Sequence, residues 1–331
     1  MKLRTNLAML GMVMAALAAL PPAVVAQGAA SAAAGPPSSQ DIILKTPAMQ
    51  HALGPADIIM PHITDSKTLE LPCFNAEWAC EVRLPTWPVK IGETTIDLGP
   101  TKHVVFMVLA ALLCLLTLGG AARAHVRATR EHGHPKGFAA GLESVVLLLR
   151  SVFKEALGEH GDAYVPFVLT LFFFILFMNL MGLIPYGSTP TGNVGVNATL
   201  AACAFVATET AGMIALGPAG YMKTIFFWPS DLSVAIKLPM TFIMTPVEIV
   251  SKFTKPFALT IRLFANMIAG HVIVLAMIGL ILLFGSWLIA IPPLLMALGI
   301  MLLEVLVSFI QAFVFAQLTA VFIGQIRAAH H

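Results

Sequence analysis

Charged residues are scarce in this sequence of 331 residues: Lys, Arg, Asp and Glu together make up 11%, against about a quarter of an ordinary soluble chain. Hydrophobic residues make up 58%. A soluble domain of this size could not bury so much apolar surface, so a soluble enzyme and a disordered protein are both excluded. The formal net charge of +2 provides no basic surface for nucleic acid. The composition is that of a polytopic membrane protein.

Cysteine is also scarce. Four cysteines in a chain of this length exclude a disulfide-stapled miniprotein. Cys73 and Cys80 lie far in sequence from any histidine that would complete a zinc site, and we expect no metal. If they face an oxidising compartment, a disulfide between them is favoured, and two free thiols are the alternative.

The sequence has no P-loop, so we expect no nucleotide chemistry and no cofactor.

The N-terminus has the layout of a secretory signal peptide. Two basic residues precede an apolar stretch over 7–25, and small residues up to Ala26 provide a cleavage site, so residues 1–26 are the predicted signal peptide. A retained first transmembrane helix is the alternative. Residues 27–102 are predicted to form a periplasmic linker, rich in Ala, Gly, Pro and Ser, and then a small acidic extramembrane segment.

Long apolar runs dominate the predicted membrane domain over 103–331, which makes the fold class all-α and polytopic. We expect about five spans, with a transmembrane hairpin followed by two long helices; the runs are 103–122, 164–184, 196–216, 237–284 and 287–326. The last two hold roughly 40 residues each, about 60 Å of helix at 1.5 Å per residue. The hydrocarbon core is only about 30 Å thick, so these helices must be strongly tilted or broken.

Charge placement predicts an amphipathic surface helix and an orientation. The stretch near 138–160 carries too many charges to span, and is predicted to lie on the membrane surface. Basic residues follow the first predicted span directly, at Arg123, Arg127, Arg130 and Lys136. Such residues collect on the cytoplasmic side, so we expect the mature N-terminus in the periplasm and Arg327 in the cytoplasm.

The two long helices contain four ionisable residues that cannot all reach the membrane surface: Glu248, Arg262, His271 and Glu304. Such residues cost several kcal/mol each at bilayer depth, and a functional site is the default interpretation. Asn266 and Gln311 add uncharged polar groups.

Spacing divides these polar residues into sets. Small residues share one helical stripe with an arginine, at Ala258, Arg262, Ala265 and Ala269, which predicts a shallow face where another helix can approach. Glu248 falls roughly on that stripe, and His271 points to the opposite face. In the second long helix Glu304, Ser308 and Gln311 form one polar stripe. The pattern suggests two part-way passages separated by Arg262 rather than one pore.

Four segments of the sequence resemble one known family, the a subunits of the bacterial F-type ATP synthase. They are KPFALTIRLFANMIAGH over 255–271, SFIQAFVFAQLTAVFIG over 308–324, FMNLMGLIP over 177–185 and GNVGVNATLA over 192–201. The resemblance implies a stator subunit with two offset proton half-channels beside a rotating ring of c subunits. It implies b-type peripheral stalk subunits and the rest of the synthase as partners, the bacterial inner membrane as location, and no catalytic site of its own.

The same resemblance assigns roles to individual residues. Arg262 matches the obligatory arginine that faces the ring carboxylate, and Asn266 and Gln311 match polar positions beside it. His271 and Glu304 match the ionisable pair of the outer half-channel. Many bacterial relatives carry the carboxylate and the histidine in the exchanged order, so the two side chains are expected to share one proton path.

The resemblance also assigns Glu248 to the acidic position of the inner half-channel. Asn193 and Asn197 are equally expected to cap the span near Val196 or to line the outer channel. The long acidic N-terminal segment departs from the family pattern, and the resemblance gives it no role.

Each candidate has a structural alternative. Arg262 could pair with a lipid or a distant carboxylate, and His271 could be a buried neutral histidine. Glu304 could be a packed, protonated carboxyl, and Glu248 a solvated acid beside two lysines.

As a whole, the chain could instead be a stand-alone proton-coupled transporter in which Arg262 binds an anionic solute, although the internal repeats typical of transporters are not found. An assembly scaffold is a further alternative, but it would not need ionisable groups in the membrane.

The predicted orientation and the cysteine pair can be tested together. If Cys73 and Cys80 face the periplasm, we expect non-reducing peptide mapping to find them joined, because an oxidising compartment favours the bridge. A free-thiol reagent should then label neither cysteine before reduction. Efficient labelling of both in intact cells would contradict the bridge and count against the outward orientation.

Overall fold

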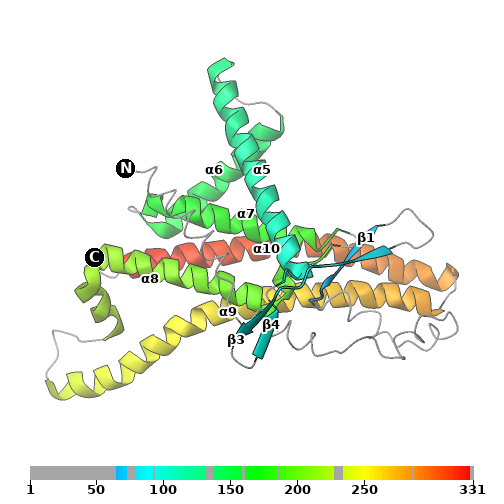
Figure 1. Ribbon diagram of the computed structural model, residues 1–331. Coiled ribbons are helices and arrows are strands. Elements are labelled where there is room, and N and C mark those ends of the chain that lie inside the picture. Colours follow the sequence, from blue (N-terminus) through cyan, green and yellow to red (C-terminus); the bar gives the residue numbers. More distant parts are fainter. Residues whose placement is uncertain are drawn as a thin grey trace.

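The computed structural model describes residues 65–72, 79–91, 94–97, 99–131, 137–158, 161–184, 187–226, 234–284 and 287–328. Within these residues the chain is mostly helical, with two small β-hairpins ahead of the first helix (Figure 1). The fold class of an all-α polytopic membrane protein is confirmed. The predicted signal peptide over 1–26 and Cys73 lie outside the described residues.

Two antiparallel hairpins form the described part of the N-terminal segment. Strand β1 (Thr68–Pro72) pairs with β2 (Ala79–Arg83), and β3 (Pro88–Ile91) pairs with β4 (Thr94–Asp97). The backbone N–H of Lys102 donates to the carbonyl of Ser66 over 2.9 Å, which ties the start of β1 to the first helix. The segment is therefore anchored to the membrane domain.

Helix α5 (Lys102–Glu131) projects away from the other long helices, and α6 (Phe138–Leu157) returns from its far end (Figure 1). Helix α5 is longer than the predicted span because it continues through the basic residues. Helix α6 coincides with the predicted surface helix and buries residues spaced four apart, Leu149, Phe153 and Leu157. Its placement at the membrane surface stays a prediction.

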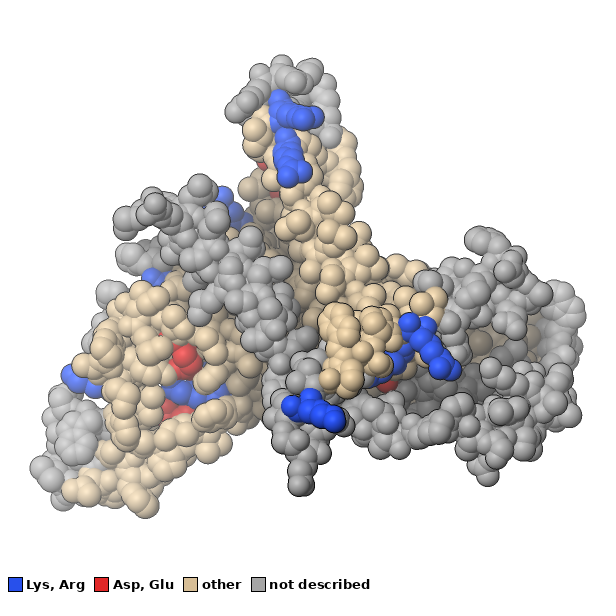
Figure 2. All heavy atoms as spheres, viewed as in Figure 1, with Lys and Arg blue, Asp and Glu red and all other residues tan. Residues whose placement is uncertain are grey.

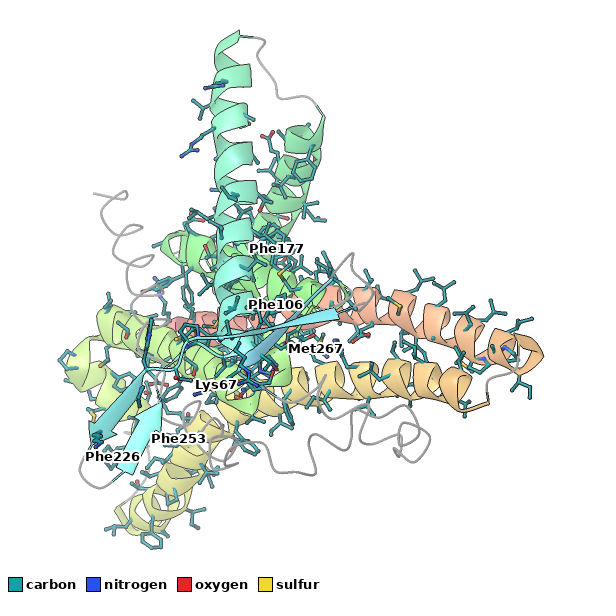
Figure 3. All side chains as sticks on the ribbon, turned by 45° about the vertical axis from the view of Figure 1, so that its right-hand side comes forward. Lys67, Phe106, Phe177, Phe226, Phe253 and Met267 are labelled. Atoms are coloured by element: carbon teal, nitrogen blue, oxygen red, sulfur yellow. The ribbon has the colours of Figure 1, made fainter. Side chains whose placement is uncertain are left out.

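Helix α7 (Val165–Met181) follows and is apolar except at Thr170 and Asn179. A helix that is hydrophobic all round belongs in the interior, and α7 packs against both α5 and the C-terminal helix. Figure 3 labels Phe106 on α5 and Phe177 on α7, which both pack against this core. The polar Asn179 is completely buried there, so it needs hydrogen-bond partners.

Helix α8 (Val194–Ile225) extends beyond the predicted span of 196–216. The continuation bends at Gly217, whose φ of 69° and ψ of 166° are not helical, and Pro218 follows. Glycine adopts positive φ without steric cost, so the chain turns there and resumes as a helix. Lys223 lies in the last turn of α8.

The two predicted long helices are present as α9 (Val234–Phe284) and α10 (Trp287–Ala328). Their 51 and 42 residues correspond to about 76 and about 63 Å of helix. Pro239, Pro246 and Pro256 lie inside α9, which bends along its length (Figure 1). In the described part of the chain, four helices are long and apolar enough to cross a membrane, and α7 is a shorter apolar helix. The count of about five spans stays a prediction.

Helix α10 is central to the packing, because it contacts α6, α7, α8 and α9. Phe153 of α6 is fully buried and lies against Phe172 and Phe313, with ring centroids 6.4 and 6.0 Å away. Phe309 of α10 meets Phe172 edge-on at 5.4 Å. Aromatic pairs of this geometry add about 0.5–1.5 kcal/mol each beyond their buried area.

Gly324 provides a test of the α6–α10 packing. A Cβ at this position would overlap the carbonyl oxygen of Ala156, a backbone atom that cannot rotate away. We expect Gly324→Ala to destabilise the protein by about 1–3 kcal/mol through overpacking, measured as a lower melting temperature in detergent. Gly299→Ala on the same helix is the matched control, since nothing described lies within 4 Å of its added Cβ. Equal melting temperatures for the two variants would contradict this contact.

Candidate functional site

His271 of α9 and Glu304 of α10 meet where the two long helices pack together. The His271 Nδ1 and Glu304 Oε1 atoms are 2.5 Å apart. The side chain of Glu304 is only 5% exposed and that of His271 is 21% exposed. Gly270 makes room for the carboxylate, because a Cβ there would lie 2.9 Å from Glu304 Oε1. The structure thus brings these two predicted site residues into direct contact.

The second ring nitrogen of His271 fixes how the pair can share a proton. Its Nε2 lies 3.1 Å from the carbonyl oxygen of Gly182 and 2.9 Å from Oγ1 of Thr189. A carbonyl oxygen only accepts hydrogen bonds, so we assign the Nε2 proton to the bond with Gly182. Nδ1 then faces Glu304, and one proton can reside on either side of the 2.5 Å contact.

A short 3-10 turn, η3 (Pro190–Gly192), belongs to the loop that carries Thr189. The hydroxyl of Thr191 donates to Asn179 Oδ1 over 2.6 Å, and Asn179 Nδ2 donates to the carbonyl of Ser308 over 3.2 Å. Asn197 Nδ2 donates to the carbonyl of Thr191 over 2.6 Å. These bonds fasten the loop to α7, α8 and α10, and so hold Thr189 against His271.

Asn193 and Asn197, whose roles the sequence left undecided, are both buried. Asn193 Oδ1 accepts a hydrogen bond from the backbone N–H of Gly195 over 2.8 Å, so Asn193 is the residue that caps α8. Its Nδ2 lies 3.4 Å from Nδ1 of His103. Asn197 is fully buried inside α8 and binds the η3 loop. Lining of an outer channel by either residue stays a prediction.

The polar residues of α10 share one buried face. Glu304, Ser308 and Gln311 are 5%, 0% and 8% exposed, in agreement with the stripe that their spacing predicts. Within the described residues, the hydroxyl of Ser308 has no hydrogen-bond partner. A polar face therefore runs along α10 on the side that packs against the other helices.

Arg262 lies on the opposite, exposed face of α9. Ala258, Ala265 and Ala269 are exposed with it, whereas residues such as Met267, labelled in Figure 3, are buried on the other face. No ion pair in the described part of the chain includes Arg262. On the described surface that Figure 2 presents, charged side chains are few, and acidic and basic side chains lie side by side at the left of the view.

The residues expected beside Arg262 do not share one environment. Asn266 is exposed on α9, whereas Gln311 is buried on α10. Glu248 is half-buried and lines a cavity. Whether Glu248 falls roughly on the stripe of Arg262 stays a prediction; of the prolines inside α9, only Pro256 lies between the two positions.

The cavity lies between α8, α9 and α10 and has a volume of about 480 Å³. Its lining includes Glu248 and a second acid, Glu209 of α8. Lys252 Nζ is 3.0 Å from Glu209 Oε2 and 3.3 Å from the hydroxyl of Tyr221, which itself donates to Glu209. The Lys252 ammonium also lies 4.6 Å from the centre of the Tyr221 ring. One of the two acids is thus neutralised by a partly buried lysine.

The sequence reasoning missed several residues of these sites. Glu209 carried a usable signal, because it is an isolated acid inside an apolar run, as is Glu248. Asn179 and Gly182 lie in the segment FMNLMGLIP that resembles the family, but the resemblance assigned them no contact. Thr189 carried no signal, because small uncharged residues are common in and between membrane helices.

The cysteine pair cannot be resolved from the described residues. Cys80 lies in β2 opposite Leu71, and Cys73 is outside the described part. The disulfide therefore stays a prediction. Cys114 and Cys203 are free thiols, the first buried and the second half-buried.

Comparison with known proteins gives one consistent result. The family model described as ATP synthase A chain matches residues 104–324. A protein named ATP synthase subunit a from Chlorobium phaeobacteroides (strain BS1) is 40% identical over 279 residues, which cover 84% of this chain and 77% of that protein. ATP synthase subunit a of Myxococcus xanthus (strain DK1622) is 44% identical over 248 residues, covering 71% of this chain and 76% of the relative. ATP synthase subunit a 2 of Chlorobaculum tepidum is 41% identical over 278 residues, with 83% and 74% covered.

Proposed function

This chain belongs to the family of ATP synthase a subunits, and we propose that His271 and Glu304 load protons in its outer passage while the cavity at Glu248 serves the inner one. The chain is the proton-translocating stator subunit of a rotary ATP synthase, without a catalytic site of its own. The stand-alone transporter has no support among the relatives.

The observation that carries the proposal is the 2.5 Å contact between His271 and Glu304. When the proton lies on Nδ1, the pair is an imidazolium and a carboxylate; when it moves to Oε1, both groups are neutral. Within the described residues neither atom has a hydrogen-bond partner of standard geometry, so the contact is a close pairing of the two groups. In either state the pair leaves no isolated charge in the interior. A proton arriving from outside can therefore be passed on by one short transfer. The structural alternatives for the two residues do not require a contact of this kind.

Arg262 separates the two passages in this mechanism. We place the ring of c subunits against its exposed face of α9, where alanines allow close approach. A guanidinium stays charged under all relevant conditions, so it favours the ionised form of a ring carboxylate opposite it and repels a passing proton. A carboxyl protonated on the outer side then returns by rotation through lipid, because the direct route past Arg262 is closed.

The inner passage is the cavity between α8, α9 and α10. Lys252 neutralises Glu209 there, whereas Glu248 is in no ion pair among the described residues. Glu248 is therefore the acid that accepts the proton leaving the ring. At roughly 200 mV each charge that crosses the membrane supplies about 4–5 kcal/mol.

The orientation follows from the basic residues at the end of α5. We place the mature N-terminus in the periplasm and the C-terminus in the cytoplasm of a bacterial inner membrane. With this orientation the loop containing η3 faces the periplasm and the cavity at Glu248 faces the cytoplasm. Peripheral stalk subunits of the b type complete the stator around this chain.

Arg262 provides the most direct test of the mechanism. We expect Arg262→Ala to abolish proton-driven ATP synthesis while the complex still assembles, because no other fixed cation occupies that exposed stripe in the described part of α9. Arg262→Lys should also fail, since lysine can deprotonate in a poorly solvated site and lacks the planar fork. Synthesis is measured in membrane vesicles, with subunit content checked on the same vesicles. A rate above about a tenth of wild type in either variant, a loss of less than about 1.4 kcal/mol, would contradict the assignment.

The shared proton path of His271 and Glu304 has its own test. We expect His271→Ala or Glu304→Ala to reduce proton flux several-fold without the total loss expected at Arg262. The double exchange His271→Glu with Glu304→His should recover more activity than either single exchange, because it restores a contact between an imidazole and a carboxyl. Pump-driven quenching of a pH-sensitive dye compares all these variants. If the double exchange is no better than the worse single exchange, the pair is structural.

A further inference from the structure

The N-terminal segment contacts the start of α5 through a titratable pair. Asp65 Oδ1 accepts a hydrogen bond from the backbone N–H of His103 over 3.2 Å, and lies 3.5 Å from Nδ1 of the same residue. The side chain of Asp65 is 12% exposed and that of His103 is 4% exposed. Figure 3 shows Lys67 close to the end of α5 near Phe106. The pair thus lies where the extramembrane segment meets the membrane domain.

His103 faces a second partner on its inner side. Its Nδ1 lies 3.4 Å from Nδ2 of Asn193. The Asn193 amide cannot flip without losing the bond from Gly195 N–H to Oδ1, so an N–H group of Asn193 points at His103. Neutral His103 can accept from Asn193, whereas protonated His103 can donate to Asp65. The two partners therefore stabilise opposite protonation states of one ring.

The loop beyond Asn193 leads to the pair deeper in the protein. Asn193 ends the short stretch that begins at Thr189, which binds His271. One loop therefore contacts His103 at one end and His271 at the other.

Unsatisfied polar atoms occur around this loop. Besides Nδ1 of His271 and Oε1 of Glu304, three buried ones near the loop have no hydrogen-bond partner within the described ranges: Thr101 Oγ1, Asn197 Oδ1 and Ser308 Oγ. Their residues are 9%, 0% and 0% exposed. Buried polar atoms are normally satisfied by protein groups or by ordered water. These atoms lie beside His103, in the first turns of α8 and next to Glu304. In these positions they could hydrogen-bond a chain of internal water molecules.

We propose that Asp65 and His103 form a proton-collecting station at the outer mouth, upstream of His271 and Glu304, so that the N-terminal segment is part of the outer passage. This inference rests on the proposed function of the deeper pair. Asp65 takes a proton at the surface and passes it to Nδ1 of His103. The imidazolium then releases its other proton, from Nε2, to the internal water chain that leads along the loop toward His271. Among the described residues, the charged groups that act on His103 are Asp65 and the adjacent, buried Lys102.

The test uses the complete ATP synthase in sealed vesicles, with Asp65→Asn and His103→Gln as variants. ATP synthesis is measured while the pH is varied on the outer face of the protein, and separately on its inner face. We expect both variants to lose rate several-fold at high outer pH, where protons are scarce, and to approach wild type at low outer pH, where loading no longer depends on collection. The response to inner pH should be unchanged.

The chain contains a matched control at the far end of α5. His125 Nδ1 lies 3.2 Å from Glu143 Oε2, with side chains 45% and 32% exposed. Glu143→Gln and His125→Gln remove the same chemical groups from a contact that belongs to neither passage. Their outer-pH profiles should coincide with that of the wild type.

Three outcomes would contradict the proposal that Asp65 and His103 collect protons. Profiles of Asp65→Asn and His103→Gln that coincide with wild type would show that the pair collects no protons. A loss that is equal at every outer pH would show a merely structural role, and an equal effect in the control variants would show a general charge effect. Failure of the proposed function is distinct: Arg262→Ala would then remain active, whereas loss of the station alone leaves Arg262→Ala inactive at every outer pH.

Discussion

The rest of the site depends on one requirement, that a carboxyl and an imidazole meet inside a stack of apolar helices without leaving a charge unpaired. The contact of 2.5 Å between Glu304 and His271 meets it. Gly270 makes the required space, and Gly182 contributes the carbonyl that fixes the imidazole ring. Side-chain amides and hydroxyls fasten the loop of η3 to three helices. Movement of this loop would release the imidazole ring of His271. Small residues and uncharged polar groups therefore determine the behaviour of the two ionisable ones.

Much of this could be predicted from the sequence because the bilayer makes ionisable residues conspicuous. Arg262, His271 and Glu304 stand out in long apolar runs, and helical spacing places Arg262 on the opposite face from His271. The same reasoning did not foresee the cavity that Glu248 lines, because a cavity depends on how three helices pack. It also ended α8 too early, because Gly217 and Pro218 interrupt the helix without stopping it.

The spacing of residues along the sequence could not predict contacts between distant segments. The approach of Asp65 to His103 joins residues 38 positions apart through a segment whose two hairpins carry no strong periodic pattern. Thr189 and Asn179 could not be recognised either, since each has a role only through the partner that the fold provides. A sequence pattern identifies groups that are costly to bury, whereas the groups that relieve this cost become visible only when the helices are assembled.

The length of α9 also bears on the direction in which the ring would rotate. Twenty-three residues separate Glu248 from His271, about 35 Å along a helix at 1.5 Å per residue, which exceeds the about 30 Å of the hydrocarbon core. If both sites lie within the hydrocarbon core, α9 must be tilted or bent there, and the two sites are then displaced sideways from one another. A sideways displacement combined with one site on each membrane face is a chiral arrangement, whose mirror image is not superimposable on it. In the proposed mechanism this handedness, built into one bent helix, determines whether proton influx turns the ring clockwise or anticlockwise.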